Sequence, residues 1–411
     1  MLLALSLSRV FKVRYVYAAL LVLVIVAALP MVNAEWVLYK KFYVDGGYTI
    51  TAARMIEDGT FLVVGATDNA GNCIIYVLYP EMQLDHKYSI TNCDGYTDFD
   101  ARGPYLAAIG VRGSSVIVTL IDHLGYTVLG TVELPSASPM SVAFSGDYIY
   151  ALVYNVSDGQ NYIYIIDTSL NIVGNVSLGA GSVDLERAEW TDLLVYFTPD
   201  GTVYVADGRN GTLNVIGSFV PTDTNLIDIA ATYNDNDGFI YIAAATGGAV
   251  YLYRYDYATD YVEELQLETY DMSFESRYPM DVSVTFVDSK PAIYVVTNDG
   301  FGYRVVEFSN VTIEALHRDS VGMIYYGGED ISYSILDYAA YAWKFTKAVE
   351  YVTTTVTTTT TATQVLVEEE TETVTTTTTV YRGYDAGDLF LIGMVGILLG
   401  CALAYLLIRR H

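Results

Sequence analysis

The residues best suited to binding an ion lie in one short segment, Asn234-Asp235-Asn236-Asp237-Gly238. Oxygen-bearing side chains alternate there and a glycine permits a sharp turn, a composition found in loops that wrap a hard cation such as Ca²⁺. The segment lacks the distal glutamate of an EF-hand and lies between two predicted strands, where a turn is needed in any case. It therefore predicts a tight turn, with a calcium site at Asp235, Asn236 and Asp237 as the alternative.

Histidine, the commonest acid–base catalyst at neutral pH, is scarce. Only His86, His123 and His317 fall in the body of the chain, and no shared motif connects them. A Ser-His-Asp hydrolase would need an additional α/β domain. Carboxylates are numerous enough to supply the pair that glycoside hydrolysis uses, but the sequence selects no pair. We therefore assign no catalytic residue and no cofactor, calcium excepted.

Cys73 and Cys93 are placed to form a disulfide bond. Cys73 opens an apolar run whose hairpin partner covers residues 84–90. In an antiparallel hairpin that turns near residues 80–82, residue 73 faces the end of that partner strand, close to Cys93. An oxidising exterior permits the bond, and two free thiols are the alternative.

Four sequons for N-glycosylation fall at predicted loops or strand starts. They begin at Asn155, Asn175, Asn210 and Asn310. In a secreted chain, this placement predicts that several of them carry glycans.

Both ends of the chain have the features of membrane targeting. Residues 1–34 combine a basic flank, an apolar run and small residues at the end, which predicts a signal peptide cleaved before Glu35. An uncleaved signal anchor is the alternative. Residues 389–408 are uncharged and long enough for one transmembrane helix. The basic tail at 409–411 then places this end in the cytoplasm.

A threonine-rich segment at 350–380 precedes the predicted membrane helix, to which residues 381–388 connect it. Such a polar segment cannot bury a core. Beside a membrane, this composition indicates an extended, O-glycosylated stalk, with a multimeric β-structured stem as the alternative.

The segment between the two ends is strongly acidic. Residues 35–388 contain all 48 Asp and Glu but only 16 of the 21 Lys and Arg. A surface of this charge repels phosphate backbones, so nucleic acid is excluded as a partner.

Residues 35–349 are predicted to form an all-β ring. Short alternating strands are separated by Asp-Gly turns, the signature of hairpins. Similar segments begin near residues 49, 91, 135, 179, 221 and 268. Their spacing of about 40–50 residues is that of a four-stranded propeller blade.

The remainders at the two ends complete the count of blades. Residues 317–347 hold only three strands, and residues 36–43 form a separate strand before the first repeat. Together they predict a blade closed by the first strand of the chain, which leaves only short sheet edges exposed. We therefore expect a single β-propeller of seven blades, with six or eight as alternatives.

Two blades carry a family resemblance. Residues 294–300, with the sequence YVVTNDG, are similar to the YVTN strand and turn of archaeal surface-layer β-propellers. Residues 164–169 and 171–173 resemble the next strand pair of that repeat. The motif is structural, so the resemblance implies a propeller at a cell surface and carries over no catalytic residue.

These features predict a single-pass membrane protein with an extracellular propeller, acting as a non-enzymatic binding or adhesion module of the cell envelope. An envelope protein or a glycan is the expected ligand. A structural surface-layer component is one alternative, and an extracellular lyase or glycosidase is another.

Overall fold

The fold is known from a computed structural model. The structure describes residues 35–56, 60–135, 137–265, 279–287, 290–297, 302–306, 312–317, 324–326, 331–336, 338–346, 352–362 and 370–380. Every regular element in these ranges is a β-strand, and they contain no helix long and apolar enough to cross a bilayer. The predicted signal peptide (1–34) and transmembrane helix (389–408) lie outside the described residues.

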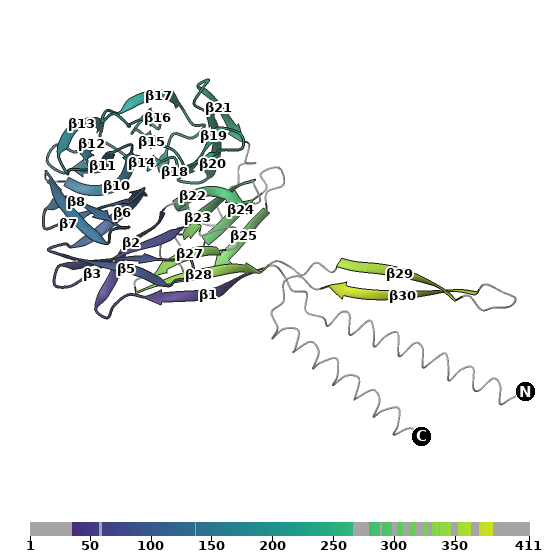
Figure 1. Cartoon of the computed structure of the whole chain (residues 1–411). Helices are drawn as coiled ribbons and strands as arrows, with labels where there is room; N and C mark the ends of the chain where they lie inside the picture. Colours follow the sequence, from purple (N-terminus) through teal and green to yellow (C-terminus); the bar gives the residue numbers. More distant parts are fainter. Residues whose placement is uncertain are drawn as a thin grey trace, which may run out of the picture. The chain divides into compact units, whose positions relative to one another are not determined.

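Seven four-stranded sheets form the propeller (Figure 1). Blade 1 consists of β2 (Tyr48–Ile56), β3 (Phe61–Asp68), β4 (Asn72–Leu78) and β5 (Leu84–Thr91). Blade 2 consists of β6 (Gly95–Arg102), β7 (Tyr105–Arg112), β8 (Ser115–Asp122) and β9 (Thr127–Leu134). Blade 3 consists of β10 (Ala137–Ser145), β11 (Tyr148–Asn155), β12 (Gln160–Asp167) and β13 (Ile172–Gly179).

The next three blades follow the same order along the chain. Blade 4 consists of β14 (Asp184–Arg187), β15 (Leu193–Phe197), β16 (Val203–Asp207) and β17 (Asn214–Phe219). Blade 5 consists of β18 (Leu226–Asn234), β19 (Phe239–Thr246), β20 (Val250–Asp256) and β21 (Tyr261–Leu265). Blade 6 consists of β22 (Pro279–Val287), β23 (Lys290–Thr297), β24 (Gly302–Val306) and β25 (Thr312–His317). The predicted start of this blade, near residue 268, lies outside the described residues.

Blade 7 is built from both ends of the propeller. β26 (Ile324–Tyr326), β27 (Ile331–Leu336) and β28 (Ala339–Thr346) are joined by β1 (Glu35–Tyr43) as the outer strand. In Figure 1 the purple β1 lies beside the green β28, although the two are far apart in the sequence. A hydrogen bond from Val44 N to Tyr338 O, 3.2 Å long, continues this pairing past the strand ends. The prediction of seven blades closed by the first strand is confirmed, and six or eight are excluded.

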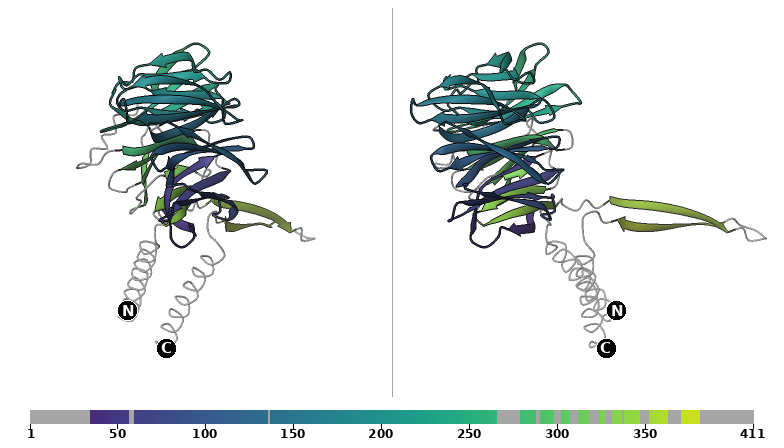
Figure 2. Two further views of the ribbon diagram at one scale, coloured as in Figure 1. Left: turned by 90° about the vertical axis from the view of Figure 1, so that its left-hand side faces the viewer. Right: turned by 60° about the vertical axis from the view of Figure 1, so that its left-hand side comes forward.

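The first strand of each blade lies at the centre of the ring. These inner strands contact one another in succession from β2 through β6, β10, β14, β18 and β22 to β26, and β26 contacts β2 again. Figure 2 shows the sheets following one another around the propeller. Residues on the inner strands of different blades are thereby brought together, although they are distant in the sequence.

The core lies between the sheets. Five consecutive residues are buried in β7 and six in β8, because each of these middle strands packs against a neighbouring blade on both faces. The outer strand β9 is largely exposed or half-buried instead. This explains why the middle strands read as continuous apolar runs rather than as strict alternation.

The threonine-rich segment differs from the extended stalk that its composition predicts. β29 (Val352–Ala362) and β30 (Glu370–Val380) pair as an antiparallel hairpin in a unit separate from the propeller. Threonine is β-branched and has a high strand propensity. The hairpin is therefore closer to the alternative of a β-structured stem, here formed within one chain.

Tyrosine joins blades as well as filling them. The Tyr88 hydroxyl of blade 1 donates to His123 O beside blade 2, at 3.3 Å. The Tyr150 hydroxyl of blade 3 donates to Gly208 O of blade 4, at 2.6 Å, and Tyr150 is fully buried. The aromatic ring of a tyrosine can therefore fill the space between two sheets while its hydroxyl donates to a backbone carbonyl of the neighbouring blade.

Replacing Tyr150 by phenylalanine is expected to destabilise the propeller by about 1–3 kcal/mol, because a buried carbonyl loses its donor. The free energy of unfolding in urea measures this change. Tyr154→Phe is the matched control, since Tyr154 lies on the same strand and is 38% exposed. Equal stability of the two variants would contradict the bridging role.

Candidate functional site

A repeated irregularity sets the side chains at the centre of the ring. Five inner strands have a register shift near their start, which re-aims the side chain that follows it. The shifts lie between Ile50 and Ala52, Tyr96 and Asp98, Pro139 and Ser141, Leu226 and Asp228, and Pro279 and Asp281. Three of these shifts are followed by an aspartate, and Asp184 opens the inner strand of blade 4.

Three of these aspartates each link their own blade to the following one. Asp98, Asp184 and Asp228 each accept a hydrogen bond from a backbone N–H on the inner strand of the following blade. The donors are Val142 N to Asp98 Oδ2 at 2.9 Å, Ile229 N to Asp184 Oδ2 at 3.3 Å and Val282 N to Asp228 Oδ2 at 2.7 Å. Hydrogen bonds from N–H groups to a charged oxygen are stronger than neutral ones, so these carboxylates hold neighbouring blades in register.

Arg54 links three blades at the centre. From β2 in blade 1, its Nη1 atom lies 3.0 Å from Asp98 Oδ1 in blade 2 and 3.1 Å from Glu186 Oε1 in blade 4. Blades 1 and 4 are not neighbours, so the side chain reaches across the ring. The Arg54 side chain is 16% exposed and both carboxylates are 14% exposed. The ion pairs are therefore largely, but not fully, withdrawn from water.

A second arginine makes a bidentate ion pair. Arg187 of blade 4 binds Asp100 of blade 2 through Nη2 to Oδ1 at 2.9 Å and Nε to Oδ2 at 3.0 Å. Arg187 Nη2 also donates to Ala101 O, and Asp100 Oδ2 accepts from Phe144 N. The planar guanidinium matches a carboxylate in this geometry, so this pair is satisfied on both sides.

The centre of the ring nevertheless has a surplus of acids. We define the central acidic cluster as Asp98, Asp100, Asp184, Glu186, Asp228 and Asp281, all on inner strands. Within the described ranges, its ion pairs to basic residues are those of Arg54 and Arg187. None of these ion pairs includes Asp184, Asp228 or Asp281. Half of the cluster therefore has no basic partner among the described residues.

This crowding changes the protonation of the cluster. Burial raises the pKa of Asp228 well above its ordinary value, and the charges of Asp184 and Asp281 raise it further. Burial also raises the pKa of Glu186, against the opposing charge of Arg54. Burial raises the pKa of Asp281 to about 6, although a hydrogen bond with Asp228 and the charge of Arg54 act in the other direction. Asp228, Glu186 and Asp281 therefore hold a proton to a higher pH than ordinary carboxyls do.

Some polar atoms on the inner strands have no hydrogen-bond partner. They are Ser141 Oγ, Asp281 Oδ2 and Ser283 Oγ. Ser141 is only 4% exposed. A buried polar atom without a partner costs free energy, so the centre of the ring has unused capacity to bind a polar group.

The predicted calcium segment forms a turn that uses its own oxygens. Asn234 Oδ1 accepts from Asn236 N at 3.0 Å, and Asp237 Oδ1 accepts from Phe239 N at 3.1 Å. Asp237 Oδ2 accepts from the Tyr241 hydroxyl, whereas Asp235 is exposed. In the part of the chain that the structure describes, no three His, Cys, Asp or Glu side chains are arranged to hold a metal ion. The hydrogen bonds account for a turn, and calcium binding stays a prediction.

The sequons and histidines lie in separate places. Asn175 and Asn210 are exposed, and Asn155 is half-buried, while Asn310 is outside the described residues. His86 stacks with Tyr126 at a ring distance of 4.6 Å. His123 lies in a turn, where it is buried and its Nε2 is hydrogen-bonded to Gly103 O at 2.9 Å. The side chain of His317 is not described.

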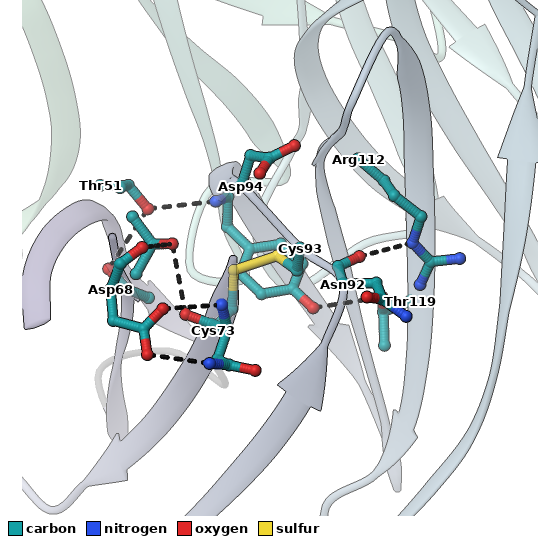
Figure 3. The surroundings of a disulfide bond; sticks show 12 residues. Thr51, Asp68, Cys73, Asn92, Cys93, Asp94, Arg112 and Thr119 are labelled. Carbon is teal, nitrogen blue, oxygen red and sulfur yellow. Dashed lines mark hydrogen bonds between the residues drawn. A yellow bond between two sulfur atoms is a disulfide. The ribbon is translucent and has the colours of Figure 1, made fainter. Parts of the chain in front are cut away.

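The predicted cysteine pair is bonded in the structure (Figure 3). The Cα atoms of Cys73 and Cys93 are 5.6 Å apart, and both residues are fully buried. Cys73 lies on β4 of blade 1, and Cys93 lies in the link to blade 2. Cys93 N also donates to Gly71 O at 3.0 Å. The disulfide therefore fixes the path of the chain between the first two blades.

Sequence reasoning missed the central acidic cluster. The signal was present as a separation of about one blade between each acid and its backbone donor: 44 residues for Asp98, 45 for Asp184 and 54 for Asp228. An alignment of the blades on their bulges would have exposed this recurrence. The position is occupied by Ala52 and Ser141 in two blades, which weakens the pattern.

Comparisons with known proteins identify the fold. No protein-family model matches the sequence, and no curated protein matches it. The β-propeller domain of Cps50 (Swd1) from Myceliophteria thermophila is similar in structure, with a TM-score of 0.55 and 13% identity over 75% of this chain and 99% of that chain. The WD40 domain of Pan2 from Neurospora crassa has a TM-score of 0.51 and 11% identity, covering 75% and 95% of the two chains. These likenesses define a WD40-like β-propeller fold.

Substituting Asp228 by asparagine is expected to change how stability depends on pH. Because the pKa of Asp228 is raised on folding, the folded state binds this proton more tightly, and the stabilisation is lost as pH rises from the unfolded pKa towards the folded one. Asparagine keeps an oxygen for Val282 N and does not titrate. The difference in melting temperature, variant minus wild type, should therefore increase as the pH rises from 4 to 8.

The exposed substitution Asp235→Asn is the control for that comparison, since it also removes one negative charge. A plot of its melting temperature against pH should run parallel to that of wild type over the same range. A constant offset between Asp228→Asn and wild type would contradict the raised pKa.

Removing the disulfide by the double substitution Cys73→Ala/Cys93→Ala should lower the free energy of unfolding by about 3 kcal/mol, because the unfolded chain regains the freedom of a 20-residue loop. Alanine avoids placing an unpaired hydroxyl in the buried site. The single substitution Cys401→Ala serves as control. Unchanged stability of the double variant would show that the bond is absent from the folded protein.

Proposed function

We propose that this protein is a cell-surface binding module, anchored by a C-terminal membrane helix at 389–408 and carrying its propeller outside the cell. The observation that carries the proposal is the closed seven-blade ring, a rigid scaffold that presents loops and a charged centre for recognition. A WD40-like propeller is typically a protein-interaction scaffold, which supports binding rather than catalysis.

The outside location has independent support. The Cys73–Cys93 disulfide is fully buried, and such bonds persist mainly in oxidising compartments. The apolar segments at the two ends of the sequence fit a signal peptide (1–34) and a single span. In this proposal the threonine-rich segment 350–380 holds the propeller away from the membrane and the ligand is an envelope protein or a glycan.

A structural role in a surface lattice is a second candidate. It is favoured by the resemblance of residues 294–300 to the YVTN repeat of surface-layer propellers. Enzymatic hydrolysis is less well supported, because Asp98, Asp100 and Glu186 are engaged by arginines.

Truncation after residue 380 is expected to release the protein into the culture medium, because the predicted span is removed. Full-length protein should sediment with membranes, and protease added to intact cells should digest its propeller. The variant Gly396→Leu/Gly400→Leu, which keeps an uncharged span, is the control and should remain in the membrane. Full-length protein in the soluble fraction, or protection from external protease, would contradict the proposal.

A further inference from the structure

The central acidic cluster carries an inference about the chemistry of the ligand. We propose that the side of the cluster formed by Asp184, Asp228 and Asp281 binds an organic cation, the guanidinium or ammonium group of a ligand with an alkyl stem. The inference rests on the proposed binding function, but not on the membrane anchor.

The first support is an imbalance of charge across the ring. On one side, Arg54 neutralises Asp98 and Glu186, and Arg187 neutralises Asp100. On the other side, three carboxylates from blades 4, 5 and 6 have no basic partner within the described ranges. These half-buried carboxylates repel one another, so this side is stabilised by a ligand that brings positive charge to it.

The second support is the set of unsatisfied polar atoms. Asp281 Oδ2 and Ser283 Oγ lie two residues apart on β22, and neither has a hydrogen-bond partner. The Asp228 carboxylate lies close to Asp281, because its Oδ2 accepts at 2.7 Å from Val282 N, the next residue along β22. Asp281 Oδ2 is thus an acceptor without a donor within the central acidic cluster, which fits a ligand that brings N–H donors.

Arg54 illustrates the mode of binding within the same ring. Its guanidinium contacts carboxylates from two different blades, Asp98 and Glu186. Asp228 and Asp281 likewise come from two different blades and lie close to each other. A guanidinium or ammonium group needs only converging acceptors, whereas a metal ion needs a tight set of ligands. No such set occurs among the described residues, so we favour an organic cation over a metal.

The residues at the bulges suggest an alkyl stem behind the charged group. Ile227 and Met280, which immediately precede Asp228 and Asp281, are 39% and 50% exposed. Apolar side chains beside carboxylates suit a ligand whose methylene groups pack on them while its charged end reaches the acids. The cation can belong to a small amine or to a basic side chain of a protein partner.

Binding should be linked to proton release. The charged groups that act on Asp281 and Asp228 are Arg54 on β2, Asp98 on β6, and Asp184 and Glu186 on β14. β26 adds no acid and no base, only Ile324, Tyr325 and Tyr326. A cation favours the ionised carboxylates and displaces their protons. With a pKa of about 6 at Asp281, affinity should be about tenfold weaker at pH 5 than at pH 8.

Isothermal titration of the full-length protein in lipid nanodiscs tests the proposal. The probes are agmatine, the tetrapeptide Gly-Arg-Gly-Gly, calcium chloride and an uncharged butyl amide. We expect saturable binding of agmatine or the peptide, tighter at pH 8, with protons released to the buffer. Tighter binding of the peptide assigns the cation to a protein partner, and tighter binding of agmatine assigns it to a small amine.

Asp281→Asn is expected to weaken binding at pH 8 at least tenfold and to abolish its pH dependence, whereas the control Asp147→Asn, at an exposed turn residue, should bind like wild type. The pH comparison on wild type needs no variant, so the test survives if Asp281→Asn fails to fold. No binding of either cation, equal binding of the uncharged amide, or binding of calcium alone would overturn the proposal. These outcomes leave the membrane fractionation result unaffected, so the two proposals fail separately.

Discussion

The guanidinium of Arg54 supplies the positive charge on which the centre of the propeller depends. It is held between Asp98 and Glu186 from two different blades. Without it, five carboxylates would face one another with only the Arg187–Asp100 pair to offset them. Removing one partner of a buried ion pair costs several kcal/mol, and here the loss would fall on three blades at once.

The ring gains order from the same acids that crowd its centre. Asp98, Asp184 and Asp228 satisfy backbone N–H groups of the following blades, which are strand edges that would otherwise lack an acceptor. A neutral side chain would serve as a weaker acceptor. Burial nevertheless raises the pKa values of Asp98 and Asp228, so the same position that orders the blades makes these carboxyls harder to ionise.

The fold was largely predictable because its information is local. Asp-Gly turns and apolar strands recur at the length of one blade, and the three-strand remainder at 317–347 required the strand at 36–43 to complete it. The Cys73–Cys93 pair followed from hairpin register for the same reason. For the segment that forms β29 and β30, a β-structured stem was only the alternative to an extended stalk, because composition alone does not distinguish a solvated threonine chain from a paired one.

The central cluster was not predictable in the same way. Arg54 and Glu186 are separated by 132 residues, and nothing near either residue marks it as a partner of the other. Only the closed ring brings them together. Asp228 and Asp281 are two acids among 48 in the chain. What distinguishes them from the others is the bulge that precedes each of them on an inner strand.

The pairing of β1 with β28 has a mechanical consequence. Because Val44 is next to Tyr338, the strands run in opposite directions, so Glu35 and Thr346 lie at the same end of the pair. The chain that continues past Thr346 leaves from a strand with neighbours on both sides, β1 and β27. Tension applied through that continuation is resisted by two ladders of hydrogen bonds, whereas tension on the other end would load the single ladder of an edge strand.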